Sequence, residues 1–254
     1  MKAKDFLILL TRLFLAYIFL SAGFCKLTHG HFGQLIGPPW LEERLAEYGL
    51  GLFAQVVAYS QIVCGALLIS QRFSTLGAIM LFPMNVSILA VTVSQNWQGT
   101  PYINTVFLIL NLLLLIYEWP KFRFLFQSGT FTVNDQALDS FRSNYFNLAG
   151  LMVLVPAAFL ATTGFYIMAA VLFSGALILF GIPLVTSSRF SMLERVMLAQ
   201  SFGAMLMVTL AFRNPPIISA LGGNIAILTI ILIIWMVMKI RKKEPEPAPE
   251  NCFV

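Results

Sequence analysis

Two long stretches of this chain carry no formal charge, and they limit what it can fold into. Residues 73–117 form a run of 45 residues without Asp, Glu, Lys or Arg, and residues 143–188 form a run of 46. A helix that crosses a membrane needs about 20 mostly apolar residues. Each stretch is therefore long enough for two membrane-spanning helices joined by a turn. Charged residues make up only 11% of the whole chain, against roughly 25% in soluble domains.

Turn signals divide these stretches, and shorter apolar runs supply further helices. Gly99 and Pro101 break the first stretch, and Gly164 breaks the second. The sequence predicts an all-α membrane protein with about eight transmembrane helices. They are expected near residues 6–25, 52–70, 73–94, 102–119, 145–163, 165–186, 191–212 and 216–239. The composition excludes a soluble enzyme, a disordered chain, a nucleic-acid-binding protein and a disulfide-rich scaffold.

The positions of Lys and Arg predict the orientation in the membrane. With the N-terminus in the cytoplasm, 12 of the 16 Lys and Arg residues fall on the cytoplasmic side, three fall outside, and Arg12 lies within a helix. This asymmetry follows the positive-inside rule. We therefore expect a multi-pass protein of the inner (plasma) membrane, with both termini cytoplasmic. The net charge of +5 reflects this asymmetry and gives no support for nucleic-acid binding.

The predicted helices divide into two groups of four. Residues 1–126 and 145–240 are each expected to form a four-helix bundle, with a cytoplasmic linker at 127–144 and a mobile, Pro-rich cytoplasmic tail at 241–254. A degenerate parallel repeat is also indicated, because the sequence around Gly65 is echoed around Gly175. On the outer side, the residues after Pro38 and Pro39 have the spacing of a short helix on the membrane surface, beginning at Trp40.

Polar side chains within the predicted helices are the candidates for function, because burying them in lipid costs free energy. We expect a polar site in the first bundle, formed by Arg12, Lys26, Gln61, Asn85 and Glu118. Arg12 is expected either to pair with Glu118 or to reach the inner headgroups. Lys26 is expected to reach the outer headgroups, and Gln61 to bond to the first helix or to Asn85. Pro83 is expected to kink the helix that carries Asn85.

The sequence contains no P-loop, zinc-protease or nucleophile-elbow motif. A metal or quinone-headgroup site at His29 and His31 is conceivable. These two residues lack a third placed ligand, so no metal site is predicted. Cys25 and Cys64 are expected to lie at different depths, so no disulfide is expected between them.

Several motifs resemble one family of membrane proteins. Residues 12–19 followed by 21–27 resemble the opening span of the DoxX-like proteins, and residues 65–68 with Arg72 resemble the second span. Residues 99–101 and 111–117 resemble the third-to-fourth connection and the fourth span. The resemblance covers about residues 5–126 and implies a four-helix transmembrane unit. The family often has Glu before the Gly-Leu-Leu stretch, whereas this chain has Gln61.

The resemblance also implies the range of functions to be considered. The family includes a subunit of a thiosulfate:quinone oxidoreductase, partners of redox enzymes, and membrane chaperones or cargo receptors. Three functions are open for this chain. The first is a non-catalytic scaffold or accessory subunit with a protein partner, and it follows from the lack of a catalytic motif and from the mobile tail. The second is a subunit of a quinone-linked redox system, which follows from the resemblance. The third is a transporter of a neutral or lipid-like molecule, which follows from the kinked third helix and the parallel halves. In the second case Arg12, Lys26 and Gln61 would line a site for a quinone headgroup.

Overall fold

The computed structural model describes residues 1–37, 40–123, 137–211 and 215–241, and none of these residues lies in a β-strand. Seven helices in this part of the chain are long and apolar enough to cross a membrane. They are α1 (Ala3–Leu27), α3 (Gly51–Ile69), α4 (Ser74–Ser94), α5 (Thr100–Phe122), α6 (Tyr145–Thr162), α7 (Tyr166–Val185) and α8 (Met192–Ala211). The last helix, α9 (Pro215–Arg241), includes the apolar stretch Ile227–Lys239. The expected all-α membrane fold is confirmed, and α9 occupies the region of the eighth expected span.

A glycine with a positive φ angle lies at each of the two predicted hairpin turns. Gly99 precedes α5 with φ 83°, and Gly164 lies between α6 and α7 with φ 87°. Both values fall in the left-handed region, which glycine adopts without steric cost. A capping box begins α8, because the Ser191 N–H donates to Glu194 at 2.9 Å and the Glu194 N–H donates to the Ser191 hydroxyl at 3.4 Å.

Among the residues that the structure describes, two short helices lie outside the spanning segments: α2 (Leu41–Ala46) and η2 (Asp139–Phe141). The expected short helix after Trp40 is confirmed by α2. Pro38 and Pro39 lie outside the described residues, as do 124–136 of the linker region and 242–254 of the tail.

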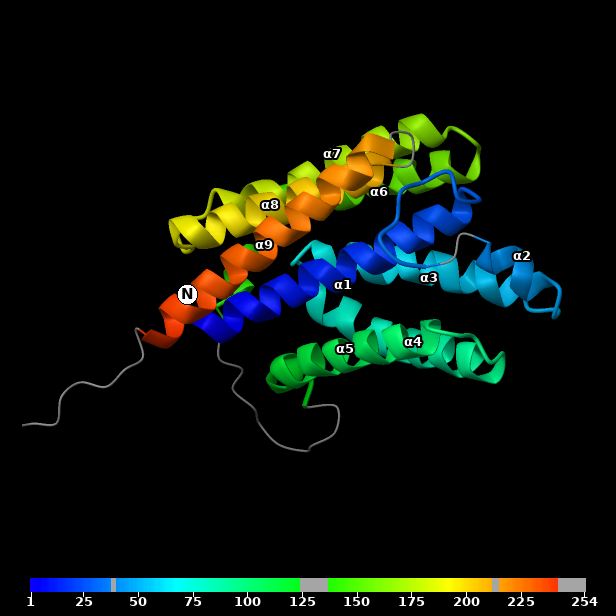
Figure 1. Ribbon diagram of the computed structural model, residues 1–254, viewed down its shortest axis with the longest axis horizontal. Coiled ribbons are helices and arrows are strands. Elements are labelled where there is room, and N and C mark those ends of the chain that lie inside the picture. The colour runs from blue at the N-terminus through cyan, green and yellow to red at the C-terminus, as the bar shows by residue number, and fades with distance from the viewer. Residues whose placement is uncertain (38–39, 124–136, 212–214, 242–254) are drawn as a thin grey trace, which may run out of the picture.

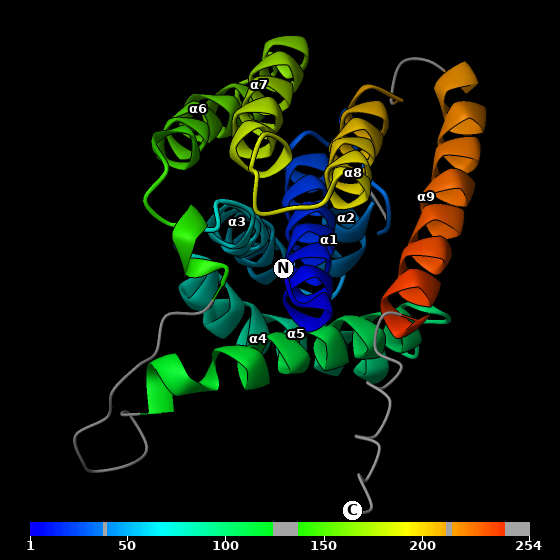
Figure 2. The ribbon, with the colours of Figure 1, turned by 90° about the vertical axis from the view of Figure 1, so that its left-hand side faces the viewer.

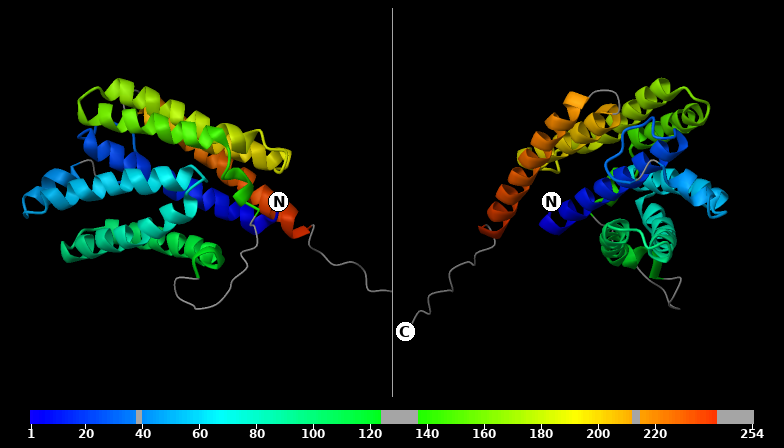
Figure 3. Two further views of the ribbon diagram at one scale, coloured as in Figure 1. Left: turned by 180° about the vertical axis from the view of Figure 1, so that it is seen from behind. Right: turned by 45° about the vertical axis from the view of Figure 1, so that its right-hand side comes forward.

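Helix α1 lies at the centre of the molecule (Figures 1 and 2). Helix α3 runs along it, α4 and α5 form a layer on one side, and α6, α7 and α8 lie on the other side (Figure 3). Helix α9 packs beside α8 (Figure 2). Because of this central position, 72% of an apolar stretch of 18 residues in α1 is buried within the protein.

Small residues allow α1 and α3 to approach closely. A Cβ added at Gly65 would lie 2.7 Å from the Ala16 carbonyl oxygen, and one added at Gly23 would lie 2.7 Å from the Ala58 carbonyl oxygen. Glycine is therefore required on both helices, as at close helix crossings in membranes. Gly175, which corresponds to Gly65 in the indicated repeat, has no atom within 4 Å of an added Cβ. The close crossing at Gly65 is thus not reproduced at Gly175.

The side chains of α1 reach both halves of the chain. The Tyr17 hydroxyl donates to the Met205 carbonyl of α8 at 2.8 Å. Phe24 packs edge-on against Phe173 of α7, with ring centroids 4.9 Å apart. The division into two four-helix units stays a prediction, and α1 contacts helices of both.

Candidate functional site

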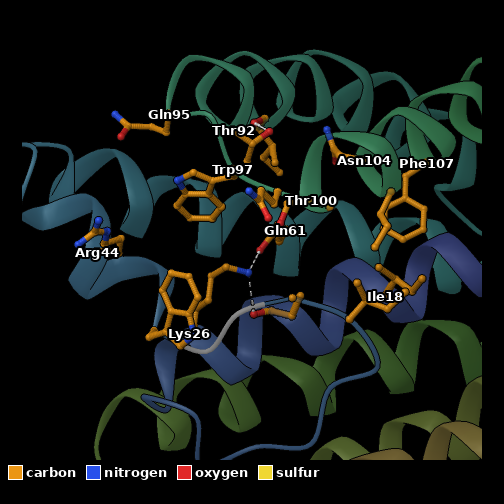
Figure 4. A pocket seen from close by; sticks show the side chains of 18 of the residues that line it. Ile18, Lys26, Arg44, Gln61, Thr92, Gln95, Trp97, Thr100, Asn104 and Phe107 are labelled. Atoms are coloured by element: carbon orange, nitrogen blue, oxygen red, sulfur yellow. Dashed lines mark hydrogen bonds between the residues drawn. The ribbon is translucent and has the colours of Figure 1, made fainter.

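A cavity with a volume of about 680 Å³ lies at the end of α1 that carries Lys26. We call it the Lys26 pocket (Figure 4). Its wall is built by α1, α3, α4, α5 and the segment that includes α2. Apolar and aromatic side chains line it together with polar ones, among them Lys26, Arg44, Gln61 and Asn104. A cavity that combines apolar walls with placed polar groups is typical of small-molecule sites.

The Lys26 side chain is buried rather than extended toward headgroups. It is only 3% exposed, and its Nζ donates to Gln61 Oε1 at 2.9 Å and to the Ala22 carbonyl at 3.2 Å. The prediction that Lys26 reaches the outer headgroups is therefore wrong. The physical reason is that these two acceptors draw the side chain back along α1 into the pocket (Figure 4). The expected bond from Gln61 to the first helix is confirmed by the same contact.

Within the described part of the chain, the Lys26 ammonium makes no direct ion pair with a carboxylate. Glu42 of α2 interacts with it electrostatically, but burial raises the pKa of the Glu42 carboxyl, and nearby His29 and Lys26 lower it by a smaller amount. A raised pKa means that Glu42 ionises less readily than an exposed Glu. Lys26 thus presents a buried positive charge whose hydrogen-bond acceptors are neutral.

Two tryptophans lie together at the pocket. Trp40 and Trp97 have ring centroids 5.7 Å apart, and both rings line the cavity. Phe107 of α5 and Ile18 of α1 line the pocket farther from α2 (Figure 4). These side chains offer flat apolar surfaces to a ring-shaped ligand. From the sequence, Trp40 was expected only as the start of a short helix on the membrane surface. Its contact with Trp97 was not expected, because the two residues are 57 positions apart in the chain.

Asn85 lies beneath the pocket on α4. Asn104, which lines the pocket from α5, donates to the Asn85 backbone carbonyl at 2.9 Å. The Asn85 side chain is fully buried, and neither its nitrogen nor its oxygen has a hydrogen-bond partner among the described residues. Pro83 lies within α4, which continues as one helix from Ser74 to Ser94.

Arg12 and Glu118 form a second polar group, which we call the Arg12 cluster. The two side chains make a buried ion pair, with 2% and 1% of their surface exposed. The ion-pair alternative for Arg12 is therefore confirmed. Arg12 also donates to Gln71 Oε1 at 3.2 Å, and Thr75 donates to Glu118 Oε2 at 2.8 Å. Lys121 contacts the same Glu118 oxygen at 2.8 Å and Asp139 of η2 at 2.6 Å.

The five expected residues thus lie in two places. Arg12 and Lys26 are 14 residues apart on one helix, which corresponds to about 21 Å at 1.5 Å per residue. The structure brings Lys26 and Gln61 together in the pocket and places Asn85 beneath it. Arg12 and Glu118 meet elsewhere. Asn104 was not among the five expected site residues, although Asn104, Asn111 and Glu118 recur every seven residues on the buried face of α5.

The remaining candidate residues belong neither to the Lys26 pocket nor to the Arg12 cluster. No three His, Cys, Asp or Glu residues within the described ranges could hold a metal ion together. His31 stacks on Tyr166 with ring centroids 4.9 Å apart. Cys25 and Cys64 are both buried free thiols. In the second half, Glu194 accepts from Trp235 at 3.2 Å and lies 3.5 Å from Lys239, so it fastens α8 to α9.

Comparison with known proteins matches residues 7–94 of the chain to a family model. No curated protein and no solved structure matches the chain significantly. The matched region spans α1, α3 and α4 and ends before α5. It therefore includes Arg12, Lys26, Gln61 and Asn85 but excludes Glu118. Residues 7–94 match the model of the DoxX family, so the N-terminal region of this membrane protein is DoxX-like.

Proposed function

We propose that this protein is an accessory subunit of a quinone-linked membrane redox system and that the Lys26 pocket binds the quinone headgroup. The chain is a multi-pass membrane protein with a DoxX-like N-terminal region. The proposal adds a ligand class and an accessory role to that description. The observation that carries it is the buried Lys26 ammonium, which is hydrogen-bonded to neutral oxygens in a cavity with apolar and aromatic walls.

The chemistry of a quinone headgroup suits these groups. Burying an ammonium away from water is costly unless electron-rich oxygens surround it. Within the described part of the chain, Lys26 uses two of its three N–H groups on protein acceptors, so one remains for a ligand. A quinone carbonyl accepts such a bond, and its flat ring matches the surfaces of Trp97 and Phe107. The positive charge would also stabilise negative charge that develops on the oxygen during reduction.

Quinone binding is tested with Lys26→Met in full-length protein reconstituted in lipid nanodiscs. The probe is decyl-1,4-benzoquinone, and binding is followed by quenching of tryptophan fluorescence. A hydrogen bond to a charged group contributes about 1.5–3 kcal/mol. Each 1.4 kcal/mol corresponds to a tenfold change in affinity, so Lys26→Met is expected to weaken binding by about 10-fold or more.

The matched control for this variant is Lys4→Met. Lys4 is an exposed lysine on the same helix, remote from the pocket lining. It should leave the affinity unchanged. Equal binding by wild type and Lys26→Met would contradict the proposal. So would saturable binding of an anionic phospholipid in place of the quinone.

We further propose that the protein lies in the inner membrane with both termini in the cytoplasm. Lys26 and Arg44 would then belong to the sparse outer set of cations, and the pocket would lie toward the outer surface. Reporter tags at residues 1 and 254 should both report a cytoplasmic location. Tags on opposite sides would contradict the proposed span count and the outer position of the pocket.

A further inference from the structure

The Asn85 side chain is a polar group whose burial is costly. It is fully buried in a membrane-spanning helix, and both polar atoms of its amide are without a protein partner among the described residues. An amide carries two N–H donors and an oxygen with two acceptor positions. Buried groups of this kind are nearly always hydrogen-bonded, and an exception calls for a water molecule or a ligand.

The position of Asn85 connects it to the Lys26 pocket. Asn85, Ile88 and Thr92 follow one another at helical spacing on one face of α4, and Ile88 and Thr92 line the pocket. Asn104 also lines the pocket and bonds to the Asn85 backbone. Figure 4 shows Asn104 and Thr92 beside α4 and α5, across the cavity from Lys26. Asn85 therefore lies one helical turn below the pocket floor.

A neighbouring asparagine shows what a purely structural amide looks like here. Asn111 of α5 is also fully buried. With its amide oriented to match its surroundings, it donates to the Ala78 carbonyl at 3.2 Å and accepts from the Phe82 N–H at 3.0 Å. Phe82 immediately precedes Pro83 in α4, and Ala78 lies one turn earlier in the same helix. Asn111 thus satisfies the backbone of α4, whereas the Asn85 amide serves no such purpose in the described protein.

We propose that Asn85 and Asn104 form a second polar site beneath the pocket, which binds water in the unliganded protein and the inner oxygen of a bound ligand. This inference rests on the proposed quinone function and makes it more specific. One ligand oxygen would meet Lys26 and Gln61, and a second oxygen on the opposite side of the ring would meet the asparagines. The pocket would therefore select ring compounds with two carbonyls on opposite sides over compounds with one.

The experiment compares Asn85→Leu with the matched control Asn111→Leu in the full-length protein. Leucine has the same branching and number of side-chain heavy atoms as asparagine and needs no hydrogen bonds. Asn85→Leu should raise the thermal midpoint of the unliganded protein by a few degrees, because it removes an amide without protein partners. Asn111→Leu should lower the midpoint, because it removes the side-chain hydrogen bonds to the Ala78 carbonyl and the Phe82 N–H.

Binding provides the second measurement. Two probes are compared: decyl-1,4-benzoquinone, with two opposite carbonyls, and 4-decylacetophenone, with a single carbonyl. Asn85→Leu should weaken quinone binding by about tenfold and leave binding of the one-carbonyl probe unchanged. Asn104→Leu provides an independent variant from α5, with the same expected change in selectivity.

The outcomes separate this inference from the proposed function. If wild type binds neither probe, the quinone function fails. If wild type binds the quinone and Asn85→Leu binds it equally well, only the second polar site is overturned. A midpoint for Asn85→Leu that falls as far as that of Asn111→Leu would also overturn it, because the amide would then have structural partners. A raised midpoint together with lost selectivity supports the inference.

Discussion

The buried ion pair of Arg12 and Glu118 yields the most quantitative prediction. Each side chain is at most 2% exposed, and the pair joins the central helix α1 to α5. Replacing Glu118 with Gln removes the negative charge and retains a polar group of the same shape. Lys121 can turn to Asp139, with which it already makes a contact of 2.6 Å. The main consequence is therefore an uncompensated charge on buried Arg12.

The expected loss follows from the cost of such a charge. Removing one partner of a buried ion pair typically destabilises a protein by about 3–5 kcal/mol. Arg12 keeps its bond to Gln71 at 3.2 Å, so we expect a value near the lower limit. A loss of about 3 kcal/mol lowers the folded-to-unfolded ratio by roughly 150-fold. Arg12→Leu combined with Glu118→Leu removes both charges, and this double variant should be more stable than Glu118→Gln alone.

Equilibrium unfolding by SDS in mixed micelles measures these differences. The control is the exposed pair of Arg44 and Glu47, whose side chains are 49% and 61% exposed. Removing Arg44 should change stability by about 0–1 kcal/mol, because solvent screens exposed pairs. The reasoning would be refuted if Glu118→Gln unfolded like wild type, or if the effects of the Arg12 and Glu118 substitutions were simply additive.

The packing of α1 supports two further predictions, read by the same SDS titration. Gly65→Leu should destabilise the protein by about 1–3 kcal/mol, because the new Cβ would lie 2.7 Å from the Ala16 carbonyl oxygen. Gly175→Ala is its control and should be neutral or stabilising, by up to about 1 kcal/mol, since its Cβ meets no atom within 4 Å. Tyr17→Phe should cost about 0.6 kcal/mol, the average for a hydrogen bond between membrane helices. It removes the 2.8 Å bond to Met205, and an unchanged stability would show that this bond does not fasten α1 to α8.

Helix positions were accessible from the sequence because charge and hydropathy act locally. Long charge-free runs and the glycines at 99 and 164 were sufficient to predict both hairpins, which the structure confirms. The packing of α1 between two layers was not predicted, because the hydropathy of a helix does not tell which neighbours it will contact. Its close approach to α3, which depends on Gly23 and Gly65, was not predicted either.

Among the polar residues, too, one contact was predicted from the sequence and another was not. The pairing of Arg12 with Glu118 was anticipated as one alternative, because a charge in lipid needs a partner or a route to water. The burial of Lys26 was not anticipated, because a lysine at the end of a membrane helix such as α1 is expected to extend its side chain to the headgroups. Its acceptor Gln61 comes from another helix, and Trp97 reaches the pocket from a third segment. Such convergence is a property of the tertiary structure and leaves no local signal. The transporter alternative stays a prediction.

A density map of the full-length protein purified in lipid nanodiscs with decyl-1,4-benzoquinone tests the central claim most directly. We predict ring-shaped density in the Lys26 pocket, within hydrogen-bond distance of the Lys26 ammonium and beside Trp97. A map in which Lys26 extends to the headgroups or pairs with a carboxylate, while the quinone lies elsewhere, would contradict this account.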